Sequence, residues 1–301
     1  MANKKRPAFD TSTFSRVQNE VNQTHDLRAD LIKEAQQHFG ARVLTYFASF
    51  STFEAQLIDR DAEMLENLLS AEHDGGPLAL VINSPGGDAL AAVRIVNVCR
   101  AYSKNQFRAI VPHMAKSAAT MVCFGANKIH MSRTAELGPV DPQVPYKDDD
   151  GQYNWISADE YVRSYENLMA AATSATGRID AYIQQLSRYD ARMIERLRSQ
   201  SELSADISVD LLQNVMMNGK TADEIRQKIA PFLVQKEKGE HGRMIGLDEA
   251  RACGIKIEEI EVGTRPWHCI WELYVRSDWV VDHGPAAVIE SVTSTVARAK
   301  P

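Results

Sequence analysis

Three short segments of the chain carry residue types whose spacing could support chemistry. The first is residues 83–87, Asn-Ser-Pro-Gly-Gly, which follow one apolar run and precede another. Adjacent glycines let the backbone turn tightly and leave N–H groups exposed, and such groups can bind an anion or an oxyanion. A plain turn between a strand and a helix has the same pattern, so both interpretations stand.

The second segment is residues 116–120, Lys-Ser-Ala-Ala-Thr. Ser117 stands where a helix is expected to begin, and a serine there is commonly an N-cap that binds the first helical N–H groups. The same position suits a nucleophile, because the side chain is exposed and the helix N-terminus stabilises negative charge. The small residues that follow would let a second backbone segment approach closely.

The third segment is residues 136–143, Glu-Leu-Gly-Pro-Val-Asp-Pro-Gln. Pro139 and Pro142 restrict the backbone on either side of Asp141. The segment is therefore either a surface turn or a rigid loop that holds an acid in a fixed orientation.

Alternating strands and helices are predicted around these segments. We predict strands over residues 42–49, 77–82, 107–112 and 128–131, and helices over residues 61–71, 88–102 and 117–126. The apolar run at 77–82 is typical of a strand covered on both faces, and 88–102 is apolar nearly all round, as in a buried helix. This alternation predicts an α/β fold with a mostly parallel sheet.

The N-terminal part and the middle of the chain show other patterns. A long amphipathic helix is predicted over residues 11–39, ended by Gly40; it is either a packing helix of the main domain or an oligomerisation arm. Residues 139–155 are predicted to form an exposed loop. Ser157 and Glu160 form a capping-box pattern that opens a largely helical stretch to about residue 217.

The C-terminal third holds shorter signals. Thr221 and Glu224 form a second capping box, residues 235–243 are a polar loop, and residues 246–254 are a short helix closed by a glycine.

The tail, residues 264–301, contains Trp267, Trp271 and Trp279. Apolar and polar residues alternate over 271–276, which predicts a half-buried strand.

Composition limits the function classes. The chain has 301 residues and a net charge of −6, which argues against general nucleic-acid binding. Its four cysteines are far apart in sequence, so we expect reduced thiols in a cytoplasmic protein and no zinc site. No signal peptide, membrane span or GxxxxGK[ST] nucleotide motif is seen, and no metal or organic cofactor is expected.

Together the three segments resemble the serine dehydrogenase proteinase family. That family belongs to the group that shares the fold of the Clp protease proteolytic subunit, signal peptide peptidase A and crotonase. The resemblance runs over about residues 42–145 and resumes at residues 241–255. It implies an α/β fold of the Clp/crotonase type, a ββα spiral, with an N-terminal helix and a long helical C-terminal half.

The resemblance also implies a domain division and an activity. Residues 1–40 would be a helical arm, 41–263 a serine peptidase domain and 264–301 a tryptophan-rich extension. In the peptidase domain, Ser117 would be the nucleophile of a serine endopeptidase that forms an acyl-enzyme. The backbone N–H groups of Gly87 (or Gly86) and Ala118 would form the oxyanion hole.

Three residues are candidates for the general base. In the Clp subunit a histidine follows the serine and an acid precedes a C-terminal helix; here Asp141 and His241 stand in those regions with the residue types exchanged. A triad of Ser117, His241 and Asp141 is one candidate arrangement, since triads are recognised by geometry and not by order. Lys116 and His113 are the others. Signal peptide peptidase A uses a later lysine, and residues 148–219 contain none.

Two other function classes fit the same fold. One is a crotonase-like acyl-CoA enzyme, and the other is a catalytically inactive scaffold. For a peptidase, the expected partners are a protein or peptide substrate, further copies of the chain in a closed homo-oligomer, and a separate unfoldase or activator. The tryptophan-rich tail would be a substrate lid or a subunit contact.

Overall fold

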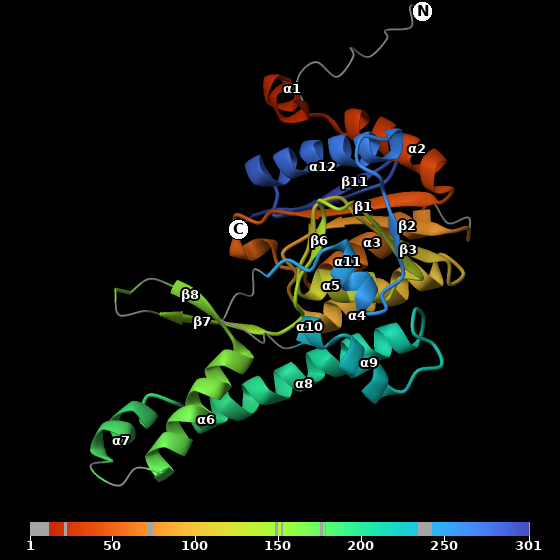
Figure 1. The fold of residues 1–301 in the computed structure, drawn as a ribbon. Coiled ribbons are helices and arrows are strands. Elements are labelled where there is room, and N and C mark those ends of the chain that lie inside the picture. Colours follow the sequence, from red (N-terminus) through yellow and green to blue (C-terminus); the bar gives the residue numbers. More distant parts are fainter. Residues whose placement is uncertain are drawn as a thin grey trace, which may run out of the picture.

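The computed structural model describes residues 12–20, 23–71, 75–147, 150–151, 153–174, 177, 179–233 and 243–300. A seven-stranded sheet lies at its centre (Figure 1). The strands stand in the order β11 (Thr295–Arg298), β10 (Ala287–Glu290), β1 (Arg42–Ala48), β2 (Leu78–Asn83), β3 (Phe107–Val111), β5 (Lys128–Met131) and β9 (Ile257–Glu259). From β1 to β9 neighbouring strands run parallel, while β10 is antiparallel to both β1 and β11. The predicted α/β class and its four strands are confirmed.

Helices cover both faces of this sheet (Figure 1). One face carries α2 (His25–Phe39) and α12 (Arg265–His283), and the other carries α3 (Asp59–Ala71), α4 (Ala89–Ala101) and α5 (Ala118–Phe124). Successive residues of β1 alternate between the two cores: Val43 and Phe47 pack with α2 and α12, and Leu44 and Tyr46 with the other layer. Coverage on both faces explains why β2 is buried along its whole length.

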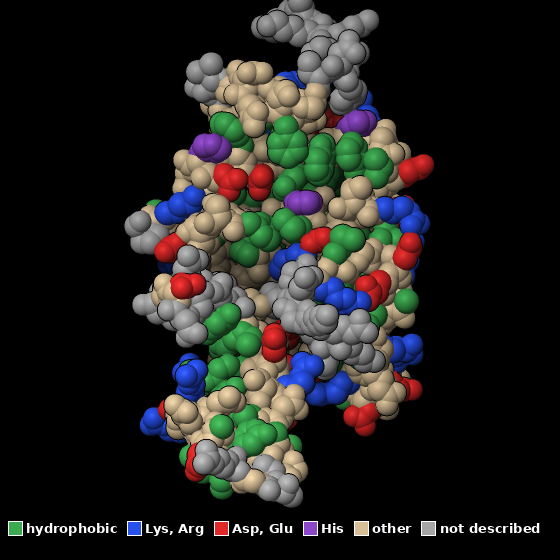
Figure 2. All heavy atoms as spheres, turned by 60° about the vertical axis from the view of Figure 1, so that its left-hand side comes forward, with side chains coloured by type: hydrophobic (Ala, Val, Ile, Leu, Met, Phe, Trp, Pro, Cys, Tyr) green, Lys and Arg blue, Asp and Glu red, His purple; other side chains and the backbone are tan. Residues whose placement is uncertain are grey.

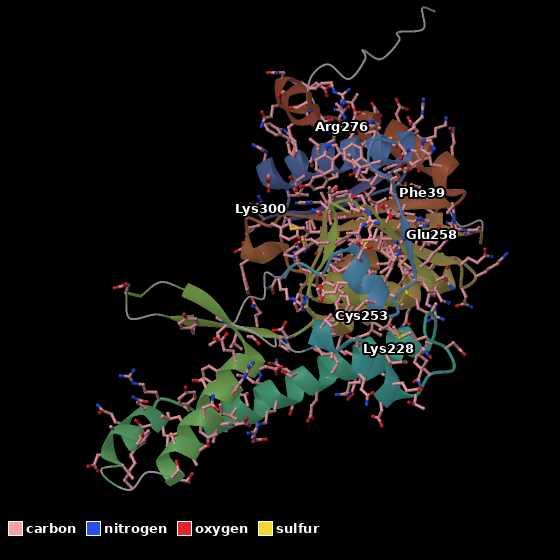
Figure 3. All side chains as sticks on the ribbon, viewed as in Figure 1. Phe39, Lys228, Cys253, Glu258, Arg276 and Lys300 are labelled. Atoms are coloured by element: carbon pink, nitrogen blue, oxygen red, sulfur yellow. The ribbon has the colours of Figure 1, made fainter. Side chains whose placement is uncertain are left out.

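The single helix predicted over residues 11–39 is wrong, because the chain breaks between α1 (Thr13–Asn19) and α2. Glu20 has an extended backbone, and its carboxylate binds the buried Arg276 of α12 (Figure 3). Gln23 donates its side-chain amide to the carbonyl of Val17, which ends the first helix. An ion pair with a distant helix therefore overrides the local helical pattern.

The strand predicted over residues 271–276 is also wrong, because these residues lie within α12. Thr264 stands at the N-cap and a proline follows in the first turn, both common at helix starts. Cys269, Leu273, Ser277 and Val281 are buried one turn apart, which is the helical period. Beyond this helix β10 and β11 join the main sheet, and the division into residues 1–40, 41–263 and 264–301 stays a prediction.

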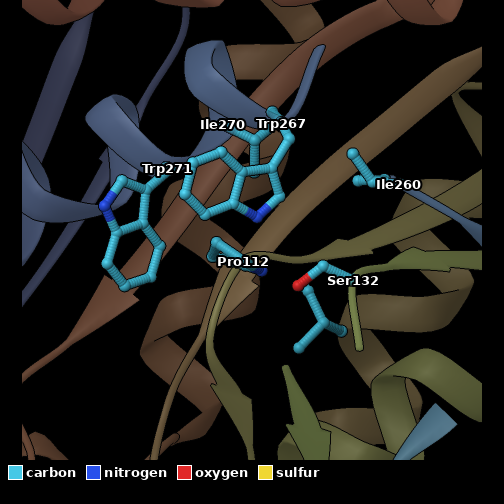
Figure 4. A pocket seen from close by; sticks show the side chains of 7 residues that line it. Pro112, Ser132, Ile260, Trp267, Ile270 and Trp271 are labelled. Carbon is cyan, nitrogen blue, oxygen red and sulfur yellow. The ribbon is translucent and has the colours of Figure 1, made fainter. Parts of the chain in front are cut away.

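The tryptophans of α12 pack partly buried against the core. Trp267 and Trp271 stack with ring centroids 5.5 Å apart beside Pro112 and Ile260, around a pocket of ≈ 10 Å³ (Figure 4). That volume suffices for about one water molecule and no substrate. On the face shown in Figure 2, hydrophobic side chains gather at the height of α12, with charged side chains around them.

A pH effect on stability arises on the same helix. Burial and the charge of Asp282 raise the pKa of Asp278 to about 6. Between its unfolded value of about 3.9 and 6, the folded chain binds more protons than the unfolded chain, so Asp278 costs stability increasingly as the pH rises. We expect Asp278→Asn to raise the free energy of unfolding at pH 7.5, by on the order of 1 kcal/mol after discounting for partial exposure.

Denaturant unfolding at pH 4 and pH 7.5 checks this expectation. The gain should be much smaller at pH 4, where the carboxyl is protonated in the folded state and about half protonated in the unfolded state. An equal gain at both pH values would show that the substitution acts through packing and not through charge.

The middle of the chain forms an arm that extends away from the sheet (Figure 1). Its elements are β7 (Gln143–Lys147), β8 (Tyr153–Ser157), α6 (Ala158–Ser174), α7 (Asp180–Leu186) and α8 (Ala191–Gln213), followed by α9 (Ala222–Lys228) and α10 (Ala230–Leu233). The exposed loop predicted over 139–155 is wrong where β7 and β8 pair as an antiparallel hairpin. A small core of Ala158, Val162, Ile194 and Leu197 holds α6 to α8.

Of the two predicted capping boxes, the second forms and the first does not. Ser157 is the last residue of β8, and its buried hydroxyl has no hydrogen-bond partner among the described residues, so the first box does not form. At the second, Thr221 Oγ1 accepts from the N–H of Glu224, and the Glu224 carboxylate accepts from the N–H of Thr221, as predicted. The polar loop predicted at 235–243 lies almost entirely outside the described residues. The short helix near residue 250 is confirmed as α11 (Leu247–Ala252).

No helix among the described residues is long and apolar enough to cross a bilayer.

Candidate active site

Ser117 stands at the start of α5 in an unusual backbone conformation. Its φ of 49° and ψ of −121° lie in a region that side chains rarely adopt and that costs about 1–3 kcal/mol. The residue occupies the N-cap position, yet its hydroxyl makes no capping hydrogen bond. The N-cap interpretation therefore lacks its defining bond, and such strain is typical of functional positions.

A second strand pair fixes this serine. β4 (Met114–Ala115) pairs in parallel with β6 (Glu136–Leu137). The N–H of Ser117 donates to the carbonyl of Pro139 at 3.1 Å, and the N–H of Gly138 donates to the carbonyl of Ala115 at 2.9 Å. The buried Thr120 hydroxyl bonds both the Ala115 and Gly138 carbonyls, at 2.7 and 3.0 Å. The second and third sequence segments thus run side by side.

The glycine segment packs directly on the serine. Because β2 and β3 are parallel neighbours, residues 84–87 and 112–117 follow their carboxyl ends at the same edge of the sheet. A Cβ on Gly86, which has a φ of +95°, would lie 2.7 Å from the Cβ of Ser117 and 2.9 Å from the nitrogen of Ala118. Only glycine allows this approach, and the structure brings all three sequence segments together.

The two glycines differ in the state of their N–H groups. The N–H of Gly86 donates to the Ser84 hydroxyl at 3.1 Å. Gly87 is held on either side, where the carbonyl of Gly86 accepts from Leu57 and the N–H of Asp88 donates to Leu57. Neither the Gly87 nor the Ala118 N–H has an acceptor among the described residues. Of the two glycines, Gly87 is therefore the one free to bind an oxyanion.

A cavity of ≈ 1120 Å³ opens over Ser117, larger than the about 300–1,000 Å³ of typical small-molecule pockets. Its lining comes from the loop after β1, the 3₁₀ turn η1 (Phe53–Ala55), the start of α4, β7 and α8. The described lining residues that carry charge are Asp88, Lys116 and Glu136.

Lys116 and Glu136 form an ion pair in this cavity. The Lys116 side chain is 11 % exposed and that of Glu136 16 %, and the ammonium lies against the carboxylate. Sequence reasoning missed Glu136 as a site residue, although it begins the third segment. Its role depends on the pairing of β4 with β6, which no local pattern reveals.

The predicted base candidates lie in different environments. His113 is half-buried against Tyr274, with ring centroids 5.0 Å apart, and its carbonyl accepts from the N–H of Glu136. Burial lowers the pKa of His113; the positive charge of Lys116 adds to this shift, and the negative charge of Glu136 opposes it. Asp141 is 3 % exposed between Val140 and Pro142, which both line the cavity.

His241 lies outside the described residues.

The described residues hold no group of three or more His, Cys, Asp or Glu side chains that could bind a metal ion. All four cysteines are buried free thiols, and burial raises the pKa of Cys99 and Cys123. Thiolate chemistry is therefore not favoured at those two positions.

The fold and this site define a mixed α/β protein with a strained serine beside the backbone N–H groups of Gly87 and Ala118, which have no acceptor among the described residues. Residues 19–152 match the family model described as ClpP-like SDH-type serine proteinase, which confirms the predicted resemblance over that segment. The match contains Gly86, Gly87, Ser117 and Asp141 and ends before residue 241.

Two relatives come from Methanocaldococcus jannaschii. The chain is 41 % identical over 96 residues to the uncharacterized protein MJ0137, a match that covers 32 % of this chain and 31 % of the relative. It is 30 % identical over 150 residues to the uncharacterized protein MJ1495, covering 47 % and 49 %. The chain thus spans less than half the length of either relative.

Proposed function

We propose that this protein is a serine peptidase that cleaves peptide bonds through an acyl-enzyme on Ser117. One observation carries the proposal: the uncapped hydroxyl of Ser117 stands on a strained backbone beside the free N–H groups of Gly87 and Ala118. If Ser117 had no chemical role, nothing at the start of this helix would offset the cost of its backbone strain, because its hydroxyl makes no capping bond.

The chemistry follows from these groups. Ser117 Oγ attacks the peptide carbonyl carbon, and the N–H groups of Gly87 and Ala118 bind the oxygen as it becomes negative. A general base takes the serine proton and returns it to the leaving amine, which leaves an ester on Ser117. Water then attacks the ester, the same base takes the water proton and gives it to Ser117 Oγ, and the acyl–oxygen bond breaks to release the carboxylic acid product.

The base is proposed to be His241, oriented by Asp141, with His113 and Lys116 as the alternatives. A histidine is favoured because its ordinary pKa of about 6.5 suits proton transfer near neutral pH. Lys116 is less suited, because its ammonium is engaged by Glu136.

Other features belong to the same proposal. The ββα-spiral arrangement is supported by the β4–β6 pair and by the bridges Leu57–Gly87 and Ser84–Ala115, which add strand pairing beside the main sheet. A cytoplasmic location, a homo-oligomer with tryptophans at subunit contacts, and a separate unfoldase or activator are proposed with it. ClpP-like proteins are typically oligomeric, which supports the oligomer.

A fluorophosphonate probe tests the activity. Its phosphorus should bond to Ser117 Oγ with loss of fluoride, and peptide mapping by mass spectrometry should place the adduct on that residue. Folded protein that never labels, with or without added partners, would favour the inactive scaffold. Turnover of acyl-CoA without labelling would favour the crotonase-like enzyme.

The cavity lining predicts which peptides are cleaved. Phe50, Phe53, Leu90 and Leu203 line it and are 39 %, 59 %, 61 % and 46 % exposed. The Asp88 carboxylate is occupied by two N–H groups of α4. We therefore expect peptides with large apolar residues at the cleavage site to be hydrolysed at least about tenfold faster than those with acidic residues, since burying an unpaired charge is costly.

Leu203→Glu provides a direct check, because this side chain lies in the cavity wall formed by α8. The variant should lose most hydrolysis of apolar peptides while a small fluorophosphonate still labels Ser117. Met193→Glu is the matched control, since Met193 is 41 % exposed on the same helix and does not line the cavity. Equal losses in both variants would contradict an apolar binding surface.

A further inference from the structure

The third sequence segment forms a slot for the Lys116 side chain. A Cβ on Gly138 would lie 2.4 Å from Cδ of Lys116 and 3.2 Å from its Cα. The bare glycine backbone therefore leaves the space that the lysine stem fills. At the end of this slot, two residues earlier on the same segment, stands the Glu136 carboxylate, which binds the ammonium.

The slot is rigidly attached to the serine. Glu136 and Leu137 lie opposite Met114 and Ala115 in the parallel pair, and the N–H of Glu136 donates to the carbonyl of His113 at 2.8 Å. Lys116, Ser117 and Glu136 all line the same cavity. Among the described lining residues, Lys116 carries the one positive charge.

We propose that Glu136 is a positioning residue that holds the Lys116 ammonium beside Ser117 as a fixed positive charge, which stabilises the negative charge that develops on the reacting oxygens during acylation. The inference rests on the proposed peptidase activity. It assigns Lys116 an electrostatic role, so the serine proton goes to another group. The Lys116 side chain is only 11 % exposed, and a preorganised charge that is largely removed from water is worth more than the same charge in solution.

The test measures the rate of fluorophosphonate labelling against pH. We expect Lys116→Met and Glu136→Gln each to slow labelling about 10- to 100-fold, less than loss of a donor in direct contact. Lys116→Met keeps an unbranched stem in the slot and removes the ammonium together with its ion pair to Glu136. Lys116→Arg should recover part of the lost rate because the positive charge returns.

The pH profile separates an electrostatic role from a structural one. Loss of Lys116 leaves the Glu136 carboxylate unopposed, which raises the pKa of a nearby base, so the acid limb of the profile moves to higher pH. Loss of Glu136 leaves the ammonium unopposed and moves that limb to lower pH. For His113 as base, the charged groups that act on it are Glu136 and Lys116, and the rings of Tyr274 and Trp271 from α12 pack against it.

Each outcome decides a different point. Absence of labelling in the wild-type protein would overturn the peptidase itself. Wild-type labelling that both Lys116→Met and Lys116→Arg abolish would make Lys116 the base and overturn the proposed role. Unchanged rates and profiles in Lys116→Met and Glu136→Gln would do the same. Glu258→Gln is the matched control, because Glu258 pairs with Lys128 at the far edge of the sheet (Figure 3).

Discussion

Ser117→Ala is expected to abolish fluorophosphonate labelling and to reduce peptide hydrolysis by about 10⁶-fold, the scale seen when a serine protease loses its nucleophile. The hydroxyl is the atom that forms the ester, and no neighbouring group can replace it. The residual rate should come from the oxyanion-binding N–H groups alone. Labelling, mapped by mass spectrometry, and peptide hydrolysis measure the two losses separately.

The unfolding temperatures of two variants separate loss of the hydroxyl from a change in backbone strain. Alanine has the same difficulty as serine with a φ of 49°, so Ser117→Ala should unfold near the wild-type temperature. Glycine adopts this conformation without strain, so Ser117→Gly should unfold at a higher temperature than Ser117→Ala while remaining unlabelled. Labelling of the Ser117→Ala protein would show that Ser117 is not the nucleophile. An unfolding temperature of Ser117→Gly no higher than that of Ser117→Ala would show that the strain at this position does not exceed the entropy cost of glycine.

Sequence patterns were sufficient wherever local chemistry decides the structure. The continuous apolar run at residues 77–82 predicts a strand buried on both faces, and β2 is one. Turn glycines and the small residues after Ser117 predict close backbone approach, and Gly86 does contact Ser117. Each of these signals is contained within a few neighbouring residues.

The sequence-based predictions failed where contacts between residues far apart in the sequence determine the structure. Six alternating residues in the tail fit a strand, but burial at every fourth position over a longer stretch makes α12 a helix. The break after α1 depends on Arg276, more than 250 residues away in sequence. Glu136 became a site residue only through the pairing of β6 with β4. The identity of the base stays open for the same reason, because a triad is defined by geometry.

Gly87→Ala is expected to lower the rate of acylation by about 10²- to 10³-fold, as the loss of one oxyanion-hole donor typically does. Gly87 has a φ of +151°, and a Cβ there would lie 2.4 Å from both the nitrogen and the oxygen of Leu57. These are backbone atoms that cannot swing aside. The Gly87 segment must therefore shift, and its free N–H group moves out of line with the reacting oxygen.

Backbone strain alone must be separated from loss of the donor. Gly40→Ala is the control, because Gly40 also has a positive φ, +57°, but a Cβ there meets nothing within 4 Å and lies at the end of α2. It should cost some stability and leave labelling unchanged. The decisive comparison is made on folded protein, with the labelling rate set against the unfolding temperature of each variant. A folded Gly87→Ala protein that labels at the wild-type rate would show that this N–H group does not bind the oxyanion, and Ala118 would then be the one remaining free donor among the described residues beside Ser117.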